Sequence, residues 1–337
     1  MTITSLGEDE LVAQLRRVVE GTQSSRVLLG IGDDAAVWQP SRSHRSAITT
    51  DALVEGVHFS RELMTLFDAG WRAVAANASD LAAMGARPVL ATVALGIPSA
   101  AGEADVLELY RGIAAAAAST GLRIAGGDLT RAPVLTIAIA AVGEVRASNV
   151  KTRSGGRPGQ VLAVTGELGA ARAGLTLARE PSLLEVDLAA PALRAFRTPQ
   201  ARCDEGRFLA ASRNVEAMMD LSDGLSTDLS RMCAASECGA VVTHVPVAES
   251  ARALAHARGE DPERFALAGG EDFELLIAVR PRAFGHLAGR FAARFGRPLY
   301  RIGTLRDGAN LAFVRNGREE PLPRTGWDHF EAAGAHA

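Results

Sequence analysis

The chain has 337 residues, of which 47% are hydrophobic, 22% charged and 5% aromatic, enough for two ordinary domains that each bury a core, and this composition argues against intrinsic disorder. The formal net charge of -3 excludes a strong overall field for nucleic acid or an anionic membrane, so any phosphate binding must be local. No apolar run approaches the roughly 20 residues that span a bilayer, and the segment MTITSLGEDELVAQL is acidic where a secretory signal is basic and then apolar. We expect a cytoplasmic protein.

The basic residues restrict how this chain could bind a nucleotide. Among the 36 basic residues lysine occurs once, as Lys151, and the others are arginine. A Walker A loop requires lysine after glycine, whereas Val150 precedes Lys151. The HRD and DFG strings of protein kinases do not occur either. Any nucleotide phosphates would therefore have to be neutralised by metal ions and arginine.

The first half of the chain alternates helical and strand patterns. In chain order we expect a helix over 6–20, a strand over Val27–Ile31, a strand over Ser46–Thr50 that ends at Asp51, a helix over 68–84, a strand over Val89–Leu95, a helix over 103–120, a short strand at Ile124–Ala125 and a strand over Val134–Val142. The segment RSGGRPGQ at 153–160 has the densest Gly and Pro content, which predicts a domain boundary near residue 150.

The second half repeats the alternation. We expect a strand over Val161–Val164, a turn and helix start over Gly166–Gly174, helices over 203–212 and 225–235, strands over Ala240–Val245 and Glu274–Val279, a helix over 283–295, and strands over 299–305 and 311–315. Two α/β domains of similar size, 1–150 and 151–337, follow from this pattern. The cysteines Cys203, Cys233 and Cys238 have no CxxC spacing, so reduced, buried thiols are expected.

Six segments combine small residues with carboxylates, and most follow an apolar strand pattern. They are GIGDD at 30–34, TTD at 49–51, NASD at 77–80, GGD at 126–128, MDLSD at 219–223 and GGED at 269–272. Carboxylates at strand ends project from the sheet edge where ligands bind, and they are the ligands that Mg²⁺ prefers. Each segment alone is equally compatible with turn or helix-capping chemistry. So many anions at one site would repel each other unless cations were bound between them.

Taken together and in order, these strings are similar to the signature segments of the bacterial thiamine-monophosphate kinases. The matching strings are GIGDDAAV, TTDALVEGVHF, NASDLAAMGA, GGDLTR, MDLSDGLSTDL, AGGEDFEL and, at 326–330, GWDHF. The chain departs from the family pattern at Gln160, where an aspartate often follows Pro-Gly, and at Glu55 and Val57 beside the histidine motif.

The resemblance implies a reaction and a fold. The reaction is transfer of the ATP γ-phosphoryl group to the phosphate of thiamine monophosphate, and the products are thiamine diphosphate and ADP. The fold is an α/β (α+β type), two-domain arrangement like aminoimidazole ribonucleotide synthetase. Its N-terminal domain binds ATP and metal and forms a homodimer through a β-sheet, and its C-terminal α/β domain closes over the site. Direct in-line transfer assisted by several Mg²⁺ ions requires no obligatory acid or base, so no catalytic acid or base is assigned.

The resemblance also assigns roles to residues. The metal ligands that it implies are Asp34, Thr49, Thr50, Asp51, Asp80, Asp128, Asp220 and Asp223. The ATP contacts that it implies are Gly127, Asp128, Arg153 and Ser222, and the contacts to the thiamine substrate are His58, Glu271 and Trp327. From the residues alone, His58 could equally be structural and Trp327 an anchor of a small C-terminal core. Asp272 and Phe273 are expected to support the turn.

Other functions share parts of this pattern. Selenophosphate synthetase would need a cysteine near the start, yet none precedes Cys203, and a hydrogenase-maturation relative would need a C-terminal cysteine, whereas this chain ends AAGAHA. Aminoimidazole ribonucleotide synthetase remains an enzyme alternative, although GVHF and GWDHF are not expected in it. A catalytically silent MgATP-binding regulator is the alternative of another class.

Overall fold

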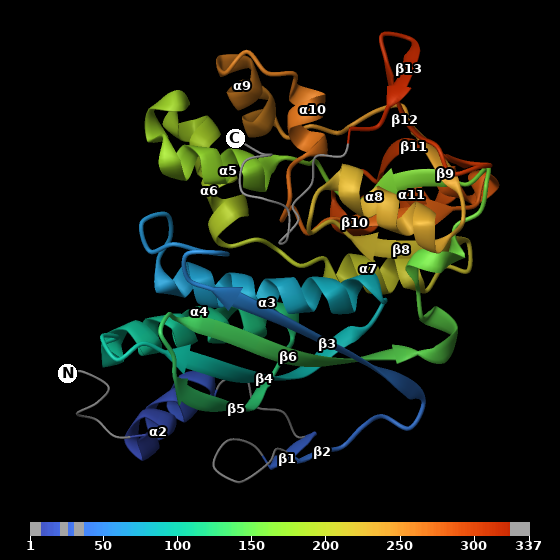
Figure 1. Cartoon of the computed structure of the whole chain (residues 1–337). Coiled ribbons are helices and arrows are strands. Elements are labelled where there is room, and N and C mark those ends of the chain that lie inside the picture. The colour runs from blue at the N-terminus through green and yellow to red at the C-terminus, as the bar shows by residue number, and fades with distance from the viewer. Residues whose placement is uncertain (1–7, 21–25, 30–36, 324–337) are drawn as a thin grey trace. The chain divides into compact units, whose positions relative to one another are not determined.

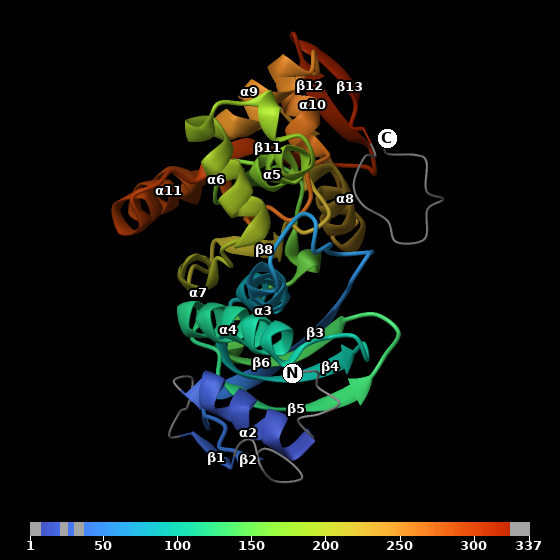
Figure 2. The same cartoon turned by 90° about the vertical axis from the view of Figure 1, so that its left-hand side faces the viewer.

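The computed structural model describes residues 8–20, 26–29 and 37–323. The chain divides into two compact units: Met1–Leu81 with Ala86–Ser148 forms the first, and Ala82–Gly85 with Asn149–Ala337 forms the second (Figure 1, Figure 2). No helix in the described ranges has the length and apolar content that crossing a membrane requires.

The first unit is a sheet with helices on one face. Its elements are α2 (Glu8–Val19), β1 (Val27–Leu29), β2 (Val37–Trp38), β3 (His44–Val54), α3 (Leu66–Ala83), β4 (Arg87–Ile97), α4 (Glu103–Thr120), β5 (Ile124–Arg131), β6 (Thr136–Arg146) and η2 (Ala147–Asn149). The main sheet has the order β3–β6–β4–β5, with β4 and β5 parallel and the other pairs antiparallel. Helices α3 and α4 lie over one face of this sheet (Figure 1, Figure 2).

The two faces of this sheet differ in exposure. Along β6, Ile137, Ile139 and Ala141 are fully buried, whereas Ala140 between them is exposed. This period of two is expected where helices cover only one face of a sheet. The opposite face, the uncovered face, has none of the described helices over Ala140, but Val27 of β1 and Trp38 of β2 pack against its residue Leu90. Ile48 of β3 lies on the uncovered face and is 76% exposed. Because large apolar side chains are usually buried, one that is exposed on an open face can indicate a contact with another molecule.

The second unit is a sheet covered on both faces. Its elements are η3 (Arg153–Gly155), β7 (Val161–Val164), α5 (Ala170–Arg179), η4 (Pro181–Leu183), α6 (Val186–Arg197), α7 (Cys203–Ala210), β8 (Val215–Asp220), α8 (Leu225–Ala235), β9 (Gly239–Val242), α9 (Glu249–Ala257), α10 (Pro262–Leu267), β10 (Leu275–Val279), α11 (Pro281–Phe295), β11 (Tyr300–Arg306), β12 (Leu311–Arg315) and β13 (Arg318–Pro321). The sheet order is β13–β12–β9–β11–β7–β10–β8, and only β12 and β9 pair in parallel among its described strands.

Two cores sandwich the sheet of the second unit. Leu162 and Val164 of β7 belong to the core that includes residues of α5, α8, α9 and α10. Their neighbours Val161 and Ala163 belong to the other core, with residues of α7 and α11. A strand covered on both faces has no polar side and therefore forms a continuous apolar run, as VLAV does. Cys233 and Cys238 are buried free thiols, as predicted, and Cys203 is a half-buried free thiol.

The predicted strand ends were wrong at two of the carboxylate segments. β3 continues to Val54, so Asp51 lies inside the strand, and β5 contains Asp128 instead of ending before it. β3 pairs with β6 over its whole length, from His44 to Val54. This pairing extends the strand through polar residues at which the local sequence pattern predicts its end. The MDLSD segment does begin at a strand end, because β8 ends at Asp220, although no strand was predicted over 215–220.

The helices predicted over 103–120 and 225–235 have those bounds in the structure, whereas α6 and α9 were not predicted. Helix α4 ends where Gly121 adopts a positive φ of 81°, a clear sequence signal. Helix α6 contains Pro191, which usually argues against a helix interior. Its buried residues, among them Phe196, pack it against the core, and tertiary packing overrides the local signal there.

Candidate functional site

Two of the predicted metal ligands are in direct contact in the first unit. The Thr49 hydroxyl of β3 donates a hydrogen bond of 2.5 Å to Asp80 Oδ2 of α3. Asp51 lies two residues after Thr49 in the same strand and opposite Ile139, which is fully buried beneath the helices. Since residues two apart in a strand share a face, Thr49, Asp51 and Asp80 supply oxygen atoms on the helix-covered side of the sheet.

The sheet register places other predicted ligands on the opposite face. Asp128 pairs with Ala94 of β4, which pairs with Ala138 of β6, and Ala138 pairs with Ala52 of β3. Directly paired residues point to the same side, so Asp128 lies on the uncovered face. Thr50 also lies there, and its hydroxyl donates to the carbonyl of Ile139 at 3.0 Å.

Gly127 shows why glycine occurs in this part of β5. A Cβ atom at Gly127 would lie 2.0 Å from the carbonyl oxygen of Val93, so any side chain would force β5 away from β4. The predicted nucleotide position of Gly127 is therefore also a packing requirement of the sheet.

The oxygen donors of the first unit fit a hard divalent cation. Mg²⁺ commonly takes one or two protein carboxylates and completes its shell with water and substrate phosphate. Asp51 and Asp80, with the Thr49 hydroxyl nearby, match that demand. Across the parts of the chain that the structure describes, no group of three His, Cys, Asp or Glu side chains is close enough to hold a metal. The predicted ligand Asp34 and its neighbour Asp33 lie outside those parts.

His58 occupies a tight turn directly after β3. The Nδ1 atom of the His58 ring accepts a hydrogen bond of 3.0 Å from the backbone N–H of Val54. The backbone N–H of His58 donates to the carbonyl of Val54 at 2.9 Å. Gly56, with a positive φ of 83°, permits this turn. Because Nδ1 is an acceptor, the neutral ring carries its proton on Nε2 and can donate it to an anionic oxygen. The turn therefore fixes the tautomer of the predicted substrate histidine.

Backbone hydrogen bonds join two predicted site loops in the second unit. The N–H of Glu271 donates to the carbonyl of Ser222 at 2.7 Å, and the N–H of Phe273 donates to the carbonyl of Leu221 at 3.0 Å. In the other direction, the N–H of Leu221 donates to the carbonyl of Glu274 at 2.8 Å. These bonds hold the segment from Asp220 to Asp223 beside the GGED segment, so they bring together residues predicted to bind metal, nucleotide and substrate.

At the junction of these two loops, some backbone positions require glycine, and another holds a non-glycine residue in a strained conformation. Gly224 has a φ of 103°, and a Cβ atom at Gly270 would lie 2.8 Å from the carbonyl oxygen of Ser222. Glu271 adopts a positive φ of 64° although it is not glycine. Non-glycine residues in this region cost roughly 1–3 kcal/mol and cluster at functional sites, although Glu237 and Asn316, outside this junction, also have a positive φ. This observation supports a functional role for Glu271.

Asp272 stabilises the start of a helix rather than the turn alone. Its carboxylate accepts hydrogen bonds from the backbone N–H groups of Gly169, at 2.7 Å, and Ala171, at 3.3 Å, at the N-terminus of α5. Burial raises the pKa of Asp272 to about 7 despite these two bonds. The GGED segment is therefore anchored to α5 as well as to the segment after β8.

Asp228 and Arg231, both on α8, contact the predicted ligand Asp223. Arg231 Nη1 forms a short ion pair with Asp223 Oδ2 and lies 2.9 Å from Asp228 Oδ1. Asp228 Oδ2 accepts the backbone N–H of Asp223 at 3.0 Å. Sequence reasoning missed both residues. The signal was the spacing of three between Asp228 and Arg231 within MDLSDGLSTDLSR, which places them on one helix face.

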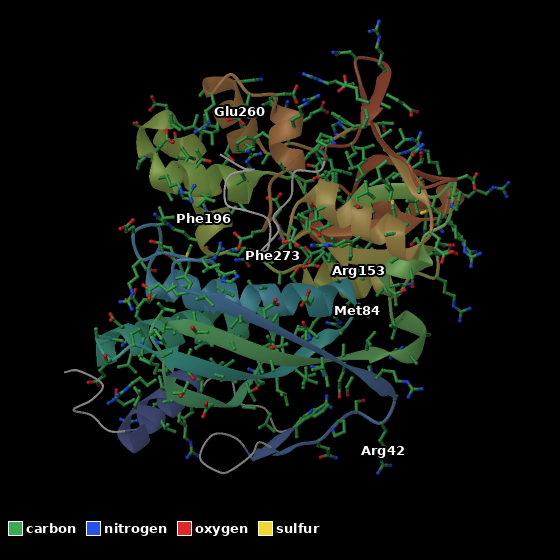
Figure 3. The ribbon with its side chains drawn as sticks, viewed as in Figure 1. Arg42, Met84, Arg153, Phe196, Glu260 and Phe273 are labelled. Atoms are coloured by element: carbon green, nitrogen blue, oxygen red, sulfur yellow. The ribbon has the colours of Figure 1, made fainter. Side chains whose placement is uncertain are left out.

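The segment that carries Arg153 is fixed by the chain's single lysine. Lys151 is 7% exposed, and its Nζ donates to the carbonyls of Val215 at 2.6 Å and Ser212 at 3.0 Å. Burial lowers the pKa of Lys151. The next residue, Thr152, accepts the N–H of Met218 at 3.1 Å, so the segment runs along β8. Arg153 itself is exposed beside this strand (Figure 3).

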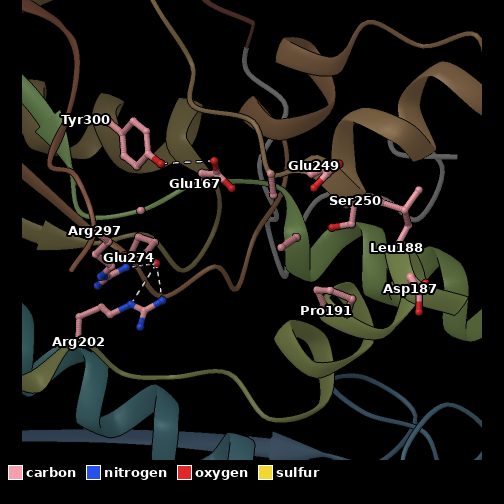
Figure 4. Close-up of a pocket in the computed structure, with 13 residues that line it drawn as sticks. Glu167, Asp187, Leu188, Pro191, Arg202, Glu249, Ser250, Glu274, Arg297 and Tyr300 are labelled. Carbon is pink, nitrogen blue, oxygen red and sulfur yellow. Dashed lines mark hydrogen bonds and ion pairs between the residues drawn. The ribbon is translucent and has the colours of Figure 1, made fainter. Parts of the chain in front are cut away.

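A cavity of about 500 Å³ lies in the second unit, outside the predicted residues (Figure 4). Its floor includes Glu274, which is 3% exposed and pairs with Arg202 at 2.6 Å and Arg297 at 3.2 Å. Thr165 also donates to Glu274 at 2.6 Å. A buried carboxylate is stable here because two arginines and a hydroxyl group donate to its oxygens. The sequence showed Glu274 only as the start of a strand, because its arginine partners are distant in the chain.

The comparisons with known proteins cover nearly all of the chain. Residues 32–145 match the model for AIR synthase related protein, N-terminal domain, and residues 157–315 match the model for its C-terminal domain. The thiamine-monophosphate kinase of Escherichia coli strain K12 is 35% identical over 96% of this chain and 98% of its own length.

Solved structures agree with these matches. The crystal structure of thiamine-monophosphate kinase from Stenotrophomonas maltophilia K279a has a TM-score of 0.81 and 32% identity, covering 92% of this chain and 96% of that one. AaThiL complexed with AMPPCP and TMP has a TM-score of 0.75 and 27% identity, covering 98% and 99%. The predicted Trp327 lies outside the described residues. The matches show that this chain belongs to the thiamine-monophosphate kinase family of AIR synthase related proteins.

Proposed function

We propose that the protein transfers the γ-phosphoryl group of ATP directly to the phosphate of thiamine monophosphate. A phosphate oxygen of the acceptor forms the new bond to the γ-phosphorus, the bond to the β,γ-bridging oxygen breaks, and ADP leaves with that electron pair. Family membership over nearly the whole chain carries the proposal. The attacking oxygen is already anionic near neutral pH, because the second pKa of a phosphate monoester is about 6. A general base is therefore unnecessary.

The main barrier to this reaction is bringing two polyanions into line. Mg²⁺ ions bound at Asp51, Asp80, Asp128, Asp220 and Asp223, with the Thr49 and Thr50 hydroxyls and Asp34 assisting, would neutralise phosphate charge. The contact between Thr49 and Asp80 and the pairing of the Asp220–Asp223 segment with Glu271 support this assignment. On the nucleotide side we assign Gly127, Asp128, Arg153 and Ser222. An arginine suits phosphate because its fork of donors matches two oxygens.

We assign His58, Glu271 and Trp327 to the thiamine substrate. The fixed Nε2–H of His58 is suited to a phosphate oxygen. Glu271, held in a strained backbone conformation, would place a carboxylate near the positive charge of thiamine. The indole of Trp327 would offer a π-face to the same cation. No covalent phospho-enzyme is part of this scheme, so detection of a stable one with ATP alone would contradict it.

We also propose a cytoplasmic homodimer. The uncovered face of the first sheet carries Ile48, 76% exposed, together with the exposed small residues Ala52, Ala94 and Ala140. A large exposed apolar side chain among small residues is suited to contact with a second copy of the same face, which also carries Thr50 and Asp128. Residues 1–150 would form the ATP- and metal-binding and dimerisation domain. Residues 151–337 would form the C-terminal α/β domain, which also supplies Arg153, Asp220, Ser222 and Asp223. Three free cysteines agree with a reducing compartment.

The decisive experiment measures thiamine diphosphate formed by purified protein from thiamine monophosphate and ATP, with and without Mg²⁺. Free thiamine is the control acceptor. Product that depends on Mg²⁺ and forms only from the monophosphate is the expected result. Turnover of formylglycinamidine ribonucleotide instead would identify an aminoimidazole ribonucleotide synthetase. MgATP binding without any turnover would identify a silent regulator.

A further inference from the structure

Arg231 is placed between two carboxylates that differ in burial. Its Nη1 contacts Asp223 Oδ2 on one side and lies 2.9 Å from Asp228 Oδ1 on the other. The side chain of Asp228 is fully buried, that of Asp223 is 25% exposed and that of Arg231 is 43% exposed. The guanidinium thus spans from the interior of the second unit to its surface.

The two contacts of Arg231 differ in strength. A buried carboxylate that loses its cationic partner destabilises the protein strongly, so we expect Arg231 to keep its contact with the buried Asp228. Asp228 also accepts the backbone N–H of Asp223, which ties helix α8 to the loop before it. The contact with Asp223 is partly exposed to solvent and is correspondingly weak. Asp223 is therefore the partner that Arg231 can give up.

Asp223 cannot satisfy Arg231 and a metal ion fully at the same time. A carboxylate oxygen that ligates a divalent cation loses most of its value to a neighbouring guanidinium, because the two cations repel each other. Arg231 would then keep Asp228 as its anchor and have free N–H donors at the surface beside Asp223. Those donors match phosphate oxygens, and the chain has no lysine near this segment for that purpose.

We propose that Arg231 is an exchangeable counter-ion that pairs with Asp223 in the ligand-free protein and moves to the polyphosphate of ATP when Asp223 ligates a divalent cation. Asp228 is the positioning residue that keeps the guanidinium directed toward this place throughout. The proposal rests on the proposed function for two points: that Asp223 ligates the metal, and that ATP binds beside the Asp220–Asp223 segment.

The exchange predicts effects of opposite sign on two ligands. In Arg231→Ala the competitor for Asp223 is gone, so Mn²⁺ alone should bind the nucleotide-free protein several-fold more tightly, measured by electron paramagnetic resonance. The same variant loses a charge-assisted hydrogen bond to phosphate, so the magnesium complex of a non-hydrolysable ATP analogue should bind about tenfold more weakly in calorimetry. Arg231→Gln, which keeps more of the side chain, should show the same two signs.

The controls separate exchange from a structural role. Arg207→Ala removes another partly exposed arginine, on α7, that pairs with an aspartate three residues away at 3.3 Å, and should change neither affinity. The tighter Mn²⁺ binding of Arg231→Ala should disappear when Asp223→Asn is added. If both affinities fall in Arg231→Ala, or neither changes, the exchange is refuted. Both readouts are equilibrium binding, so they test Arg231 even if thiamine monophosphate proves not to be the acceptor.

Discussion

At the scale of single residues, the partners of each carboxylate determine what it does. Glu144 of β6 is 4% exposed and accepts hydrogen bonds from Arg26 at 2.8 and 2.5 Å and from the N–H of Ser41 at 2.7 Å. It is a structural carboxylate with every oxygen occupied. Asp51 lies on the same face of β3 as Thr49, whose hydroxyl donates to Asp80 of α3, so we propose a cation-binding role for Asp51.

Asp51→Asn is expected to lower the rate of thiamine diphosphate formation by well over tenfold while leaving the fold intact. The amide keeps the shape of the side chain but removes the charge that a divalent cation needs. Turnover and a thermal melt by circular dichroism check this. Asp204→Asn, at an exposed position on α7, serves as the control and should retain activity. Full activity in Asp51→Asn would refute the metal assignment.

Glu144 makes stability depend on acid pH. Its hydrogen bonds with Arg26, the largest cause, lower the pKa of Glu144 to about 2, below the ordinary value near 4.5. A lowered folded-state pKa adds stability that is present above about pH 4.5 and is lost as the pH falls toward 2. Because Arg26 is partly exposed, we expect on the order of 2 kcal/mol. Urea unfolding between pH 2 and 6 should show this loss in the wild type and not in Glu144→Gln.

Single residues also show what the sequence could predict. Asp220 lies at the end of β8, but the strand itself was not predicted, because Glu216 interrupts its apolar pattern. Asp128 was misplaced because its strand continues through polar residues, and the side it faces depends on pairing with β4 and β6. Arg231 was missed because its function depends on Asp223, eight residues away around a turn.

At the scale of elements, the second unit is organised by two loops that share backbone hydrogen bonds. One follows β8 and the other precedes β10, and β8 and β10 are adjacent antiparallel strands. The pairing of Asp220 with Leu275 places both loops at the same end of the sheet. Glu271 and Ser222, far apart in the sequence, thereby become neighbours.

Gly270→Ala is expected to separate these loops. The new Cβ would lie 2.8 Å from the carbonyl oxygen of Ser222, the oxygen that accepts the N–H of Glu271. We expect a loss of about 1–3 kcal/mol in the free energy of unfolding and at least a several-fold rise in KM for thiamine monophosphate. Gly285→Ala is the matched control, because nothing lies within 4 Å of its Cβ position in α11, and it should stabilise by up to about 1 kcal/mol. Equal effects of both substitutions would contradict the argument.

Elements with strong local signals were predicted well, and those formed by packing were not. Helix α4 has acidic residues in its first turn and glycine after its last, so its bounds follow from the sequence. Helices α6 and α9 are amphipathic but lack a side-chain N-cap, and Pro191 interrupts α6. The order of strands in the second sheet is non-sequential, and no local signal encodes it.

At the scale of the whole molecule, the division into two α/β units could be inferred from the Gly and Pro content after residue 150. The surface that each unit offers to other molecules could not be inferred from the sequence, because it depends on which face of a sheet the helices leave open. The exposure of Ile48 became visible only with the β3–β6 pairing in place.

If the protein forms the proposed homodimer, Ile48→Asp is expected to convert it into a monomer. A charge at position 48 would have to be buried without a partner if Ile48 lies in the contact between the two copies. Size-exclusion chromatography with light scattering measures the mass directly. Val186→Asp is the control, since Val186 is 79% exposed on α6 and lies in the other unit. A wild-type monomer, or a variant that stays dimeric, would refute this interface.

The chemical reactivity of the single lysine reports on local opening of the structure around it. An amine reagent needs an unprotonated, accessible Nζ, and the Nζ of Lys151 is enclosed and bonded to the carbonyls of Ser212 and Val215. Labelling of this side chain therefore requires local opening of the segment that carries Arg153. The rate at which one label is incorporated at Lys151 thus measures how often that segment detaches from β8, and a ligand that holds Arg153 in place will slow the labelling.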